Sequence, residues 1–376
     1  MKYKVFNTNK TDNVTQPMFF GETPNTARYD VNKYPVFDKI TNNMLGYFWR
    51  PEEIDISKDI KDFKELTSHE QHIFISNLQR QILLDSVQGR SPNVAMLPFV
   101  SLPELETLIE TWSFFETIHS RSYTYLIQNV FSDPTRVFDQ IMETEKIVSD
   151  AKAITKHYDD FIEYGTWHNL LGEGEHTVNG KKVSISTREL KKKFYLMIIS
   201  INILEGIRFY VSFACSWAFA QQQHRMEGNA KIIKLICRDE NLHLGITQNI
   251  IKRLAEDDPI FEEIIEECKP EVIQMYQDAV DDEKAWAAYL FKDGSMLGLN
   301  EQLLCDYVEY MANRRMKSIG LSALYKQTND PLSWTKHWIN SESVQVAPQE
   351  VEVSSYTVGA VVQDVVEGQT FSSFTL

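Results

Sequence analysis

Apolar residues recur every three or four positions over long stretches of the chain, which is the spacing of one face of an α-helix. The stretch 103–130 begins with Pro103 and contains no later proline and no glycine, so it predicts one long helix. Similar periods run through 72–86, 194–213 and 229–254. The pattern predicts an all-α fold in which several long helices bury one face each.

An acidic residue interrupts the apolar face of each of four predicted helices. These residues are Asp85, Glu116, Glu205 and Glu240. A single buried glutamate is usually explained by an ion pair with an arginine. An ionised carboxylate on a buried face is costly unless it is paired or bound to a metal. Four such carboxylates on four helices are better explained together, by bound metal ions.

Two of these acids begin the motif Glu-x-x-His. Glu116 precedes His119 and Glu240 precedes His243 by three positions, so the members of each pair share a helix face. Two such pairs, together with one carboxylate from each of two more helices, can enclose two cations inside a four-helix bundle. The alternative for a lone inward histidine, a hydrogen-bonded core residue, does not account for the full set.

A third Glu-x-x-His, formed by Glu173 and His176, lies in a different setting. Three glycines and the pair Asn179-Gly180 surround it, between short β-branched runs. Such residues are typical of a loop and a tight hairpin turn. We therefore predict a small β-hairpin here and no metal ligand.

The composition of the ligand set bears on the metal. Many carboxylates and only one nitrogen per ion favour iron or manganese, whereas zinc is more often held by cysteine and histidine. We therefore predict that the site binds a pair of iron ions. Bridging carboxylates hold two ions about 3.5 to 4 Å apart, and at that separation both can give electrons to one dioxygen molecule.

Tyr123 lies four residues after His119, one helical turn along the same inward face. A tyrosine beside two redox metal ions can be oxidised. Phe209, Phe213 and Ile236 could shield the resulting radical from water and reductants. The alternative is that all four belong to an ordinary aromatic and aliphatic core.

Several motifs together resemble one family, the radical-generating β subunits of class Ia ribonucleotide reductases of enteric bacteria and their phages. The resemblance covers nearly the whole chain. One departure is Gly206, where the family often has alanine. The motifs are PMFFG at 17–21, FWRPEE at 48–53, LLDSVQGRSPN at 83–93, ETIHSRSY at 116–123, ILEGIRFYVSF at 203–213, RDENLH at 238–243 and QVAPQEVEVSSY at 345–356.

The resemblance implies a ferritin-like di-iron carboxylate bundle with extra helices and a small hairpin insertion. It implies two iron ions per chain, oxo-bridged when oxidised, with manganese possible, and a stable radical at Tyr123. It also implies a radical pocket formed by Phe209, Phe213 and Ile236. The residues that match the metal ligands of the family are Asp85, Glu116, His119, Glu205, Glu240 and His243.

The resemblance further implies transfer of the oxidising equivalent to a separate α subunit. Trp49 and Asp239 match the residues that link His119 to the surface, and Glu350 and Tyr356 match those that carry the radical through the tail. A cysteine of the α subunit would then start reduction of a ribonucleotide to a deoxyribonucleotide. The implied partners are the α subunit, a second β copy and an electron donor for cluster assembly.

Charge and cysteine usage limit the function classes. A net charge of −15 argues against binding nucleic acid or an anionic membrane. The four cysteines are scattered singly, as expected for reduced thiols in the cytoplasm. The one apolar stretch of membrane length, 197–220, contains Glu205 and Arg208, so we predict a core helix.

Three segments are expected along the chain: an N-terminal arm at 1–30, a helical domain at 31–340 and a flexible tail at 341–376. The tail contains no lysine or arginine and ends in FSSFTL, whose apolar side chains could anchor it on the α subunit. Competing functions are an iron-storage protein of the ferritin class, a di-iron oxidase that acts on its own substrate, and a structural bundle without metal.

Overall fold

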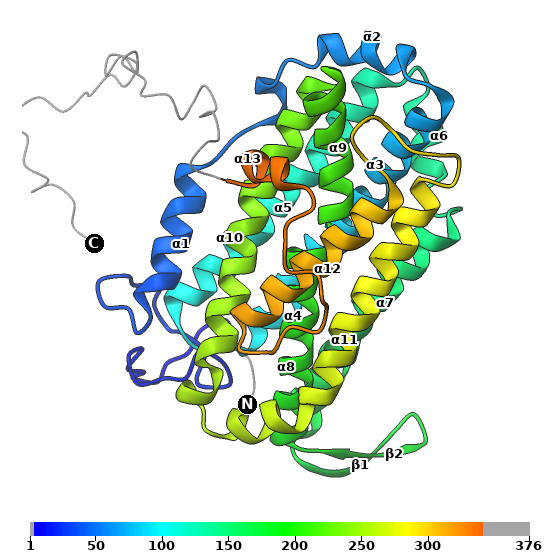
Figure 1. Cartoon of the computed structure of the whole chain (residues 1–376). Coiled ribbons are helices and arrows are strands. Elements are labelled where there is room, and N and C mark those ends of the chain that lie inside the picture. The colour runs from blue at the N-terminus through cyan, green and yellow to red at the C-terminus, as the bar shows by residue number, and fades with distance from the viewer. Residues whose placement is uncertain (1–3, 341–376) are drawn as a thin grey trace, which may run out of the picture.

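The computed structural model describes residues 4–340 as a bundle of long helices (Figure 1). Residues 341–376 lie outside the described part. The first half contains α1 (Pro35–Gly46), α2 (Ser57–Glu65), α3 (Ser68–Gln88), α4 (Ser91–Met96), α5 (Pro103–Val130), α6 (Pro134–Asp139) and α7 (Glu145–Leu171). The second half contains β1 (Gly174–Val178), β2 (Lys181–Ile185), α8 (Thr187–Ile203), α9 (Tyr210–Gln223), α10 (Glu227–Asp257), α11 (Ile260–Leu290), α12 (Glu301–Ser318) and α13 (Lys336–Ile339).

Short 3-10 turns complete the described chain at Pro51–Glu53, Leu97–Phe99 and Ser333–Thr335. The predicted helix at 103–130 is confirmed as α5. The all-α prediction is also confirmed, because the hairpin is the only sheet in residues 4–340.

The hairpin β1–β2 projects from the end of the bundle opposite α2 (Figure 1). Its strands are antiparallel, and Val178 pairs with Lys181 across the turn. Asn179 and Gly180 both have positive φ, 50° and 78°, as a two-residue type I′ turn requires. The predicted hairpin is therefore confirmed.

The third Glu-x-x-His pair has structural partners at this hairpin. The imidazole of His176 contacts the Gly172 carbonyl, and a Glu173 carboxylate oxygen accepts a hydrogen bond from the Thr187 amide. Neither residue belongs to the buried clusters of acids and histidines found in residues 4–340. Glu173 and His176 thus lie outside the candidate metal centre, as predicted.

One continuous helical rod, 187–223, is formed by α8, a π-helical turn at Leu204–Arg208 and α9. It is long and apolar enough to cross a membrane, yet its most apolar window is entirely buried inside the protein. It is a core helix. The π turn was not predicted, because the apolar positions before and after it keep the three-or-four spacing of an α-helix.

Two arginines hold backbone carbonyls of the π turn. Arg315 of α12 donates to the Gly206 carbonyl at 3.1 Å, and Arg80 of α3 donates to the Arg208 carbonyl at 2.9 Å. Gly206 also allows Arg315 to approach, since a Cβ there would lie 3.1 Å from its Cγ. A π turn shifts the hydrogen-bond register of a helix, and such turns are common at functional sites.

The start of α10 is capped by side chains from α2. Asp59 accepts hydrogen bonds from the amides of Gly228 and Asn229, at 3.1 and 2.6 Å, and Asp62 accepts one from the amide of Met226 at 2.9 Å. Negative groups at a helix N-terminus satisfy free amides and oppose the positive end of the helix dipole. These contacts fix α10 at its first turn.

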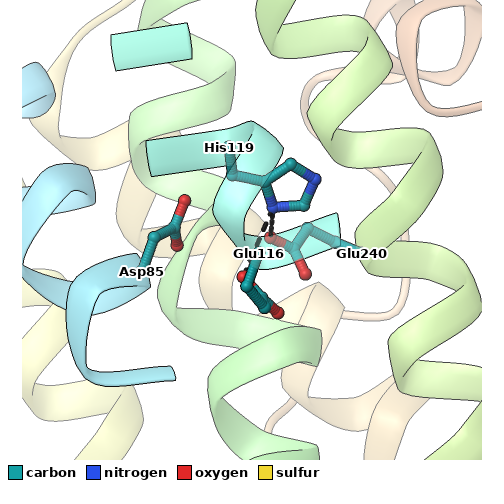
Figure 2. A group of neighbouring side chains, drawn as sticks. All are labelled: Asp85, Glu116, His119 and Glu240. Atoms are coloured by element: carbon teal, nitrogen blue, oxygen red, sulfur yellow. Dashed lines mark ion pairs between the residues drawn. The ribbon is translucent and has the colours of Figure 1, made fainter. Parts of the chain in front are cut away.

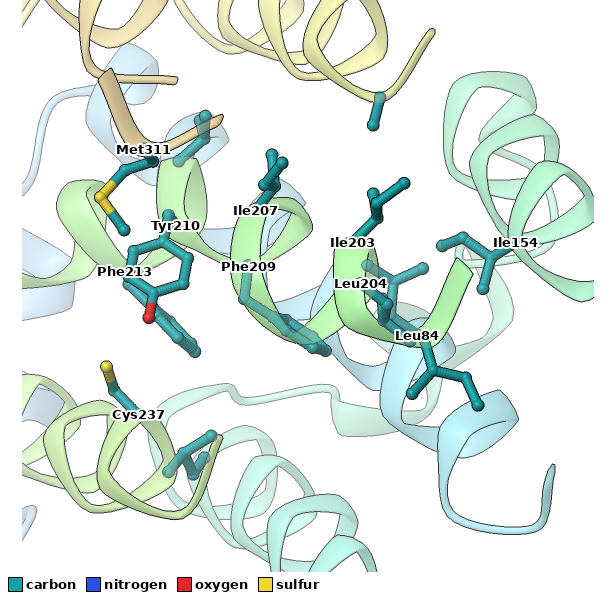
Figure 3. Close-up of a cluster of buried hydrophobic side chains, with 14 of the residues drawn as sticks. Leu84, Ile154, Ile203, Leu204, Ile207, Phe209, Tyr210, Phe213, Cys237 and Met311 are labelled. Atoms are coloured by element: carbon teal, nitrogen blue, oxygen red, sulfur yellow. The ribbon is translucent and has the colours of Figure 1, made fainter. Parts of the chain in front are cut away.

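Apolar side chains from several elements meet around the π turn (Figure 3). The side chains labelled there belong to α3, α7, the 203–208 region, α9, α10 and α12, and all of these are buried. The N-terminal segment joins the same core, because Met18 and Phe19 are buried and Phe19 pairs with Val100 in an isolated bridge. The division into arm, helical domain and tail stays a prediction.

Candidate metal centre

The six candidate ligands come from four elements of the bundle, and each has no exposed surface. α3 carries one, the π turn one, and α5 and α10 carry an acid and a histidine each. Their positions are Asp85 on α3, Glu116 and His119 on α5, Glu205 in the π turn, and Glu240 and His243 on α10.

These residues form two overlapping groups whose potential ligand atoms lie within 4.8 Å of one another. The first group consists of Asp85, Glu116, His119 and Glu240 (Figure 2). The second consists of Glu116, Glu205, Glu240 and His243. Glu116 and Glu240 belong to both, which is the arrangement that bridging carboxylates have between two metal ions.

The Nδ1 atom of His119 faces the carboxylates of the first group, and its Nε2 atom faces away from that group. The Nδ1 atom lies 3.4 Å from Glu116 Oε2 and 3.2 Å from Glu240 Oε1 (Figure 2). The Nε2 atom lies 3.2 Å from Asp239 Oδ2. A histidine ligand is typically oriented in this way, with one nitrogen for the metal and the other held by a carboxylate.

His243 occupies the corresponding place in the second group. Its Nδ1 atom lies 2.9 Å from Glu240 Oε2 and 3.1 Å from Glu116 Oε1. The indole of Trp112 donates to the same Glu116 oxygen at 3.0 Å, and its ring centroid lies 5.4 Å from that of His243. Trp112 therefore helps to hold Glu116 in place.

The buried acids and histidines shift one another's pKa values. Burial raises the pKa of Asp85 well above its ordinary value, and the charges of Glu116 and Glu240 add to this. The pKa of Glu240 is lowered, because the effect of burial is outweighed by the neighbouring side chains of Glu205 and His119. The pKa of His119 is raised well above its ordinary value, because burial is outweighed by the charge of Glu240. The protonation of each of these groups therefore depends on the charges of its neighbours.

The donor set fits two divalent ions. Both carboxylate oxygens of Asp85 and the Oε2 atom of Glu205 are buried and make no hydrogen bond. Leaving such atoms without a partner costs about 1 to 3 kcal/mol each, and more for charged groups. Four carboxylates would balance the four positive charges of two divalent ions, and the two histidines would provide one nitrogen to each.

Tyr123 is fully buried on α5, one turn beyond His119. Burial raises the pKa of its phenol well above the ordinary value, and the charge of Asp85 is the next cause. The hydroxyl makes no well-formed hydrogen bond. The phenol is thus protonated and shielded from water.

The three residues of the predicted radical pocket are also fully buried. Phe209 follows the π turn directly, and its ring stacks on that of Phe213 at 5.7 Å (Figure 3). Ile236 lies on α10, one turn before Glu240. Their role in shielding Tyr123 stays a prediction.

A hydrogen-bonded chain leads from His119 to Trp49. The indole of Trp49 donates to Asp239 Oδ2 at 2.8 Å, and the same oxygen contacts His119 Nε2. Trp49 and Asp239 were expected here from the family resemblance alone. Glu350 and Tyr356, which were expected to continue this path, lie outside the described residues.

Two further residues near the centre were not predicted. Gln88, at the end of α3, donates from its amide to Glu205 Oε1 at 2.7 Å, and Tyr158 of α7 donates to the Gln88 oxygen at 2.9 Å. The position of Gln88 three residues after Asp85 was a usable signal, because both share a helix face. No sequence pattern pointed to Tyr158.

A polar cleft of about 720 Å³ lies between α3 and α5. Its lining includes Ser86, Ser120 and Arg121. It approaches the centre at Gly89, where a Cβ would lie 3.3 Å from that of Glu116. Asp85 and Glu116 also line the cleft, although each is fully buried, so the cleft reaches two of the candidate ligands from its polar side.

Comparison with known proteins gives concordant results. Residues 28–331 match the family model for the ribonucleotide reductase small chain. The chain is 54% identical over 378 residues to ribonucleoside-diphosphate reductase 1 subunit beta of Escherichia coli O157:H7, with both chains fully covered. It is 42% identical over 373 residues to the beta subunit of Enterobacteria phage T4, with 96% of each covered.

Among solved structures, the R2 subunit of the Clostridium botulinum ribonucleotide reductase superposes with a TM-score of 0.76 at 31% sequence identity. The alignment covers 90% of this chain and 99% of that one. The matched family model spans most of the sequence and includes all six clustered acids and histidines. The chain therefore belongs to the ribonucleotide reductase small-chain family, as a beta subunit of the oxidoreductase ribonucleoside-diphosphate reductase.

Proposed function

We propose that the chain generates a tyrosyl radical at Tyr123 beside a pair of iron ions and delivers its oxidising equivalent to the large subunit. The observation that carries this proposal is the convergence of six buried ligands into two groups that share Glu116 and Glu240. A bound pair of ferrous ions would supply two of the four electrons for dioxygen reduction, the Tyr123 phenol would supply the third, and an external reductant would supply the fourth. Manganese is the second candidate metal, because the same donors suit both.

The metal ligands are proposed to be Asp85 and His119 at the first ion, Glu205 and His243 at the second, and Glu116 and Glu240 between them. Each histidine would bind through Nδ1, the atom that faces the acids. For His119 this leaves Nε2 to Asp239. The protein thereby fixes the ring orientation of this ligand before a metal arrives.

Tyr123 is proposed as the residue that stores the oxidising equivalent. Oxidation of a neutral phenol requires loss of both an electron and a proton. After burial, the charge of Asp85 contributes most to the raised pKa of the phenol. We therefore assign this carboxylate as the acceptor of the phenolic proton. Phe209, Phe213 and Ile236 are proposed to exclude water and reductants.

Transfer to the large subunit is proposed to use the chain from His119 through Asp239 to Trp49. The two hydrogen bonds of Asp239 Oδ2 support this route, because they allow proton and electron transfer to be coupled. Glu350 and Tyr356 are proposed to continue the route through the tail, 341–376, which would also bind the large subunit. A second copy of the chain and a reductant for assembly complete the proposed set of partners, and the cytoplasm is the proposed compartment.

The experiment that tests this function is electron paramagnetic resonance after loading with ferrous iron and exposure to oxygen. We expect a tyrosyl radical signal in the wild-type protein and none in Tyr123→Phe. The substitution removes a hydroxyl without a hydrogen-bond partner, so folding and metal content should be retained. Metal analysis of both proteins provides the control, and a signal that survives the substitution would falsify the assignment.

A further inference from the structure

Gln88 is a fully buried amide between the candidate metal centre and α7. Its nitrogen donates to Glu205 Oε1 at 2.7 Å, and its oxygen accepts from the hydroxyl of Tyr158 at 2.9 Å. Tyr158 is itself almost completely buried. The three side chains thus form a short chain without solvent between them.

The two ends of an amide are chemically different, and the two hydrogen-bond partners of Gln88 distinguish them. A carboxylate oxygen only accepts hydrogen bonds, so Glu205 requires the NH₂ end of Gln88. Tyr158 retains its phenolic proton and donates it, so it requires the oxygen end. Tyr158 therefore prevents the amide from turning its oxygen toward the Glu205 carboxylate, where the two oxygens would repel.

The contact leaves one oxygen of Glu205 for a metal ion. Oε1 is occupied by Gln88, whereas Oε2 makes no hydrogen bond and lies 3.9 Å from His243 Nδ1. Glu205 is also the only one of the four acids that belongs to the second ligand group and not to the first. Asp85 has the reverse membership.

We propose that Gln88 is a positioning residue for Glu205 and that Tyr158 fixes the orientation of Gln88. The pair sets the affinity of the second metal position, formed by Glu116, Glu205, Glu240 and His243. Within residues 4–340, neither side chain of the pair is hydrogen-bonded to Asp85 or His119 of the first position. This inference rests on the proposed function of the six residues as a site for two metal ions.

Titration of the full-length metal-free protein with manganese(II) tests the inference. Wild-type protein should bind two ions per chain and show the resonance spectrum of a spin-coupled pair. In Gln88→Met, which keeps the side-chain length but removes the amide, the second ion should bind about 10- to 100-fold more weakly, the usual effect of losing an outer hydrogen bond to a ligand. At one equivalent the spectrum should be that of an isolated ion.

Tyr158→Phe should change binding in the same direction but less, because the amide remains and loses only its anchor. Tyr164→Phe is the matched control. This tyrosine lies on the same helix, and its hydroxyl donates to the Ser184 carbonyl at the hairpin, away from the metal centre. It should bind two ions as the wild type does.

Several outcomes overturn the inference. Binding of two ions by Gln88→Met with unchanged affinity would do so, and so would equal weakening of both positions, since that is the effect of a general loss of structure. If circular dichroism shows that Gln88→Met does not fold, the same titration is made with Gln88→Asn, whose shorter amide cannot reach Glu205. That result and the result for Tyr158→Phe then decide whether the inference holds. If the wild-type protein binds no manganese, the proposed function itself is what has failed.

Discussion

Arg80 of α3 is a fully buried cation. Its Nε atom donates to Asp150 at 3.0 Å, its terminal nitrogens pair with Glu283, and one of them also donates to the Arg208 carbonyl. The guanidinium lies over the ring of Trp286. A buried charge with this many partners joins α3, α7, α11 and the π turn, and removing a single partner should be strongly destabilising.

Glu283 gives this network a pH dependence. Burial raises the pKa of its carboxyl to about 7, and Arg80 only partly opposes the shift. The pKa of Glu283 in the folded state lies above its ordinary value of 4.5, so the protonated carboxyl stabilises the fold. This stabilisation is fully present below pH 4.5 and is lost as pH rises through about 7. We expect the wild type to lose up to roughly 3 kcal/mol of unfolding free energy relative to Glu283→Gln over this range.

Urea denaturation of both proteins at pH 5, 6.5 and 8 measures this difference. Glutamine keeps the size of the side chain but does not titrate, so it is the matched variant. A wild-type stability that runs parallel to that of Glu283→Gln across the range would contradict the expected titration.

At the level of single residues, the sequence predicted the acids and histidines because each interrupts a regular apolar stripe. Trp112 lies on such a stripe too, but an aromatic residue there does not disclose that its indole donates to Glu116. Gln88 and Tyr158 are separated by 70 positions, and nothing in a single sequence pairs them. Contacts of this kind depend on which helices become neighbours.

At the level of elements, the period of the apolar residues predicted the long helices, and the turn residues predicted the hairpin. Neither signal predicted the π turn. Its five residues keep both flanking apolar stripes in register with the core, so the pattern is the same as that of a plain α-helix. The capping of α10 by Asp59 and Asp62 was equally invisible, because those acids lie on α2, more than 160 positions before their partners.

Two glycines of α10 provide a test of that cap. A Cβ on Gly228 would lie 2.7 Å from the backbone oxygen of Asp55, whereas a Cβ on Gly245 would meet nothing within 4 Å. We expect Gly228→Ala to lower the free energy of unfolding by about 1 to 3 kcal/mol through overpacking. Gly245→Ala should raise it by up to about 1 kcal/mol through helix propensity.

Thermal unfolding of the two variants and the wild type measures both effects. Because the substitutions are chemically identical and lie on one helix, the difference between them isolates the close contact of the first turn of α10 with the segment 55–59. Equal stability of the two variants would show that the first turn of α10 can shift without loss.

At the level of the whole molecule, family membership and architecture were predictable because the ligands, the hairpin and the motifs agree with one another. The partner surface was predicted from the composition of the tail and stays a prediction, since the tail lies outside residues 4–340. Its function has to be tested with the complete chain and a large subunit.

Removal of residues 350–376 should leave the Tyr123 radical intact, because all six proposed ligands lie in the helical body. Nucleotide reduction with the large subunit should fall to background. Full-length Tyr356→Phe is the control that separates docking from radical transfer, because it should still bind the large subunit but not support turnover. Unchanged turnover of the truncated protein would refute the proposed role of the tail.

The spread of the six acids and histidines over α3, α5, the π turn and α10 has a consequence for biosynthesis. The helix with Asp85 leaves the ribosome on the order of ten seconds before the helix with His243, at ordinary rates of translation. Before α10 has emerged, a nascent chain therefore offers only part of the ligand set to the metals of the cell, and selection among those metals takes place once all four elements have packed together.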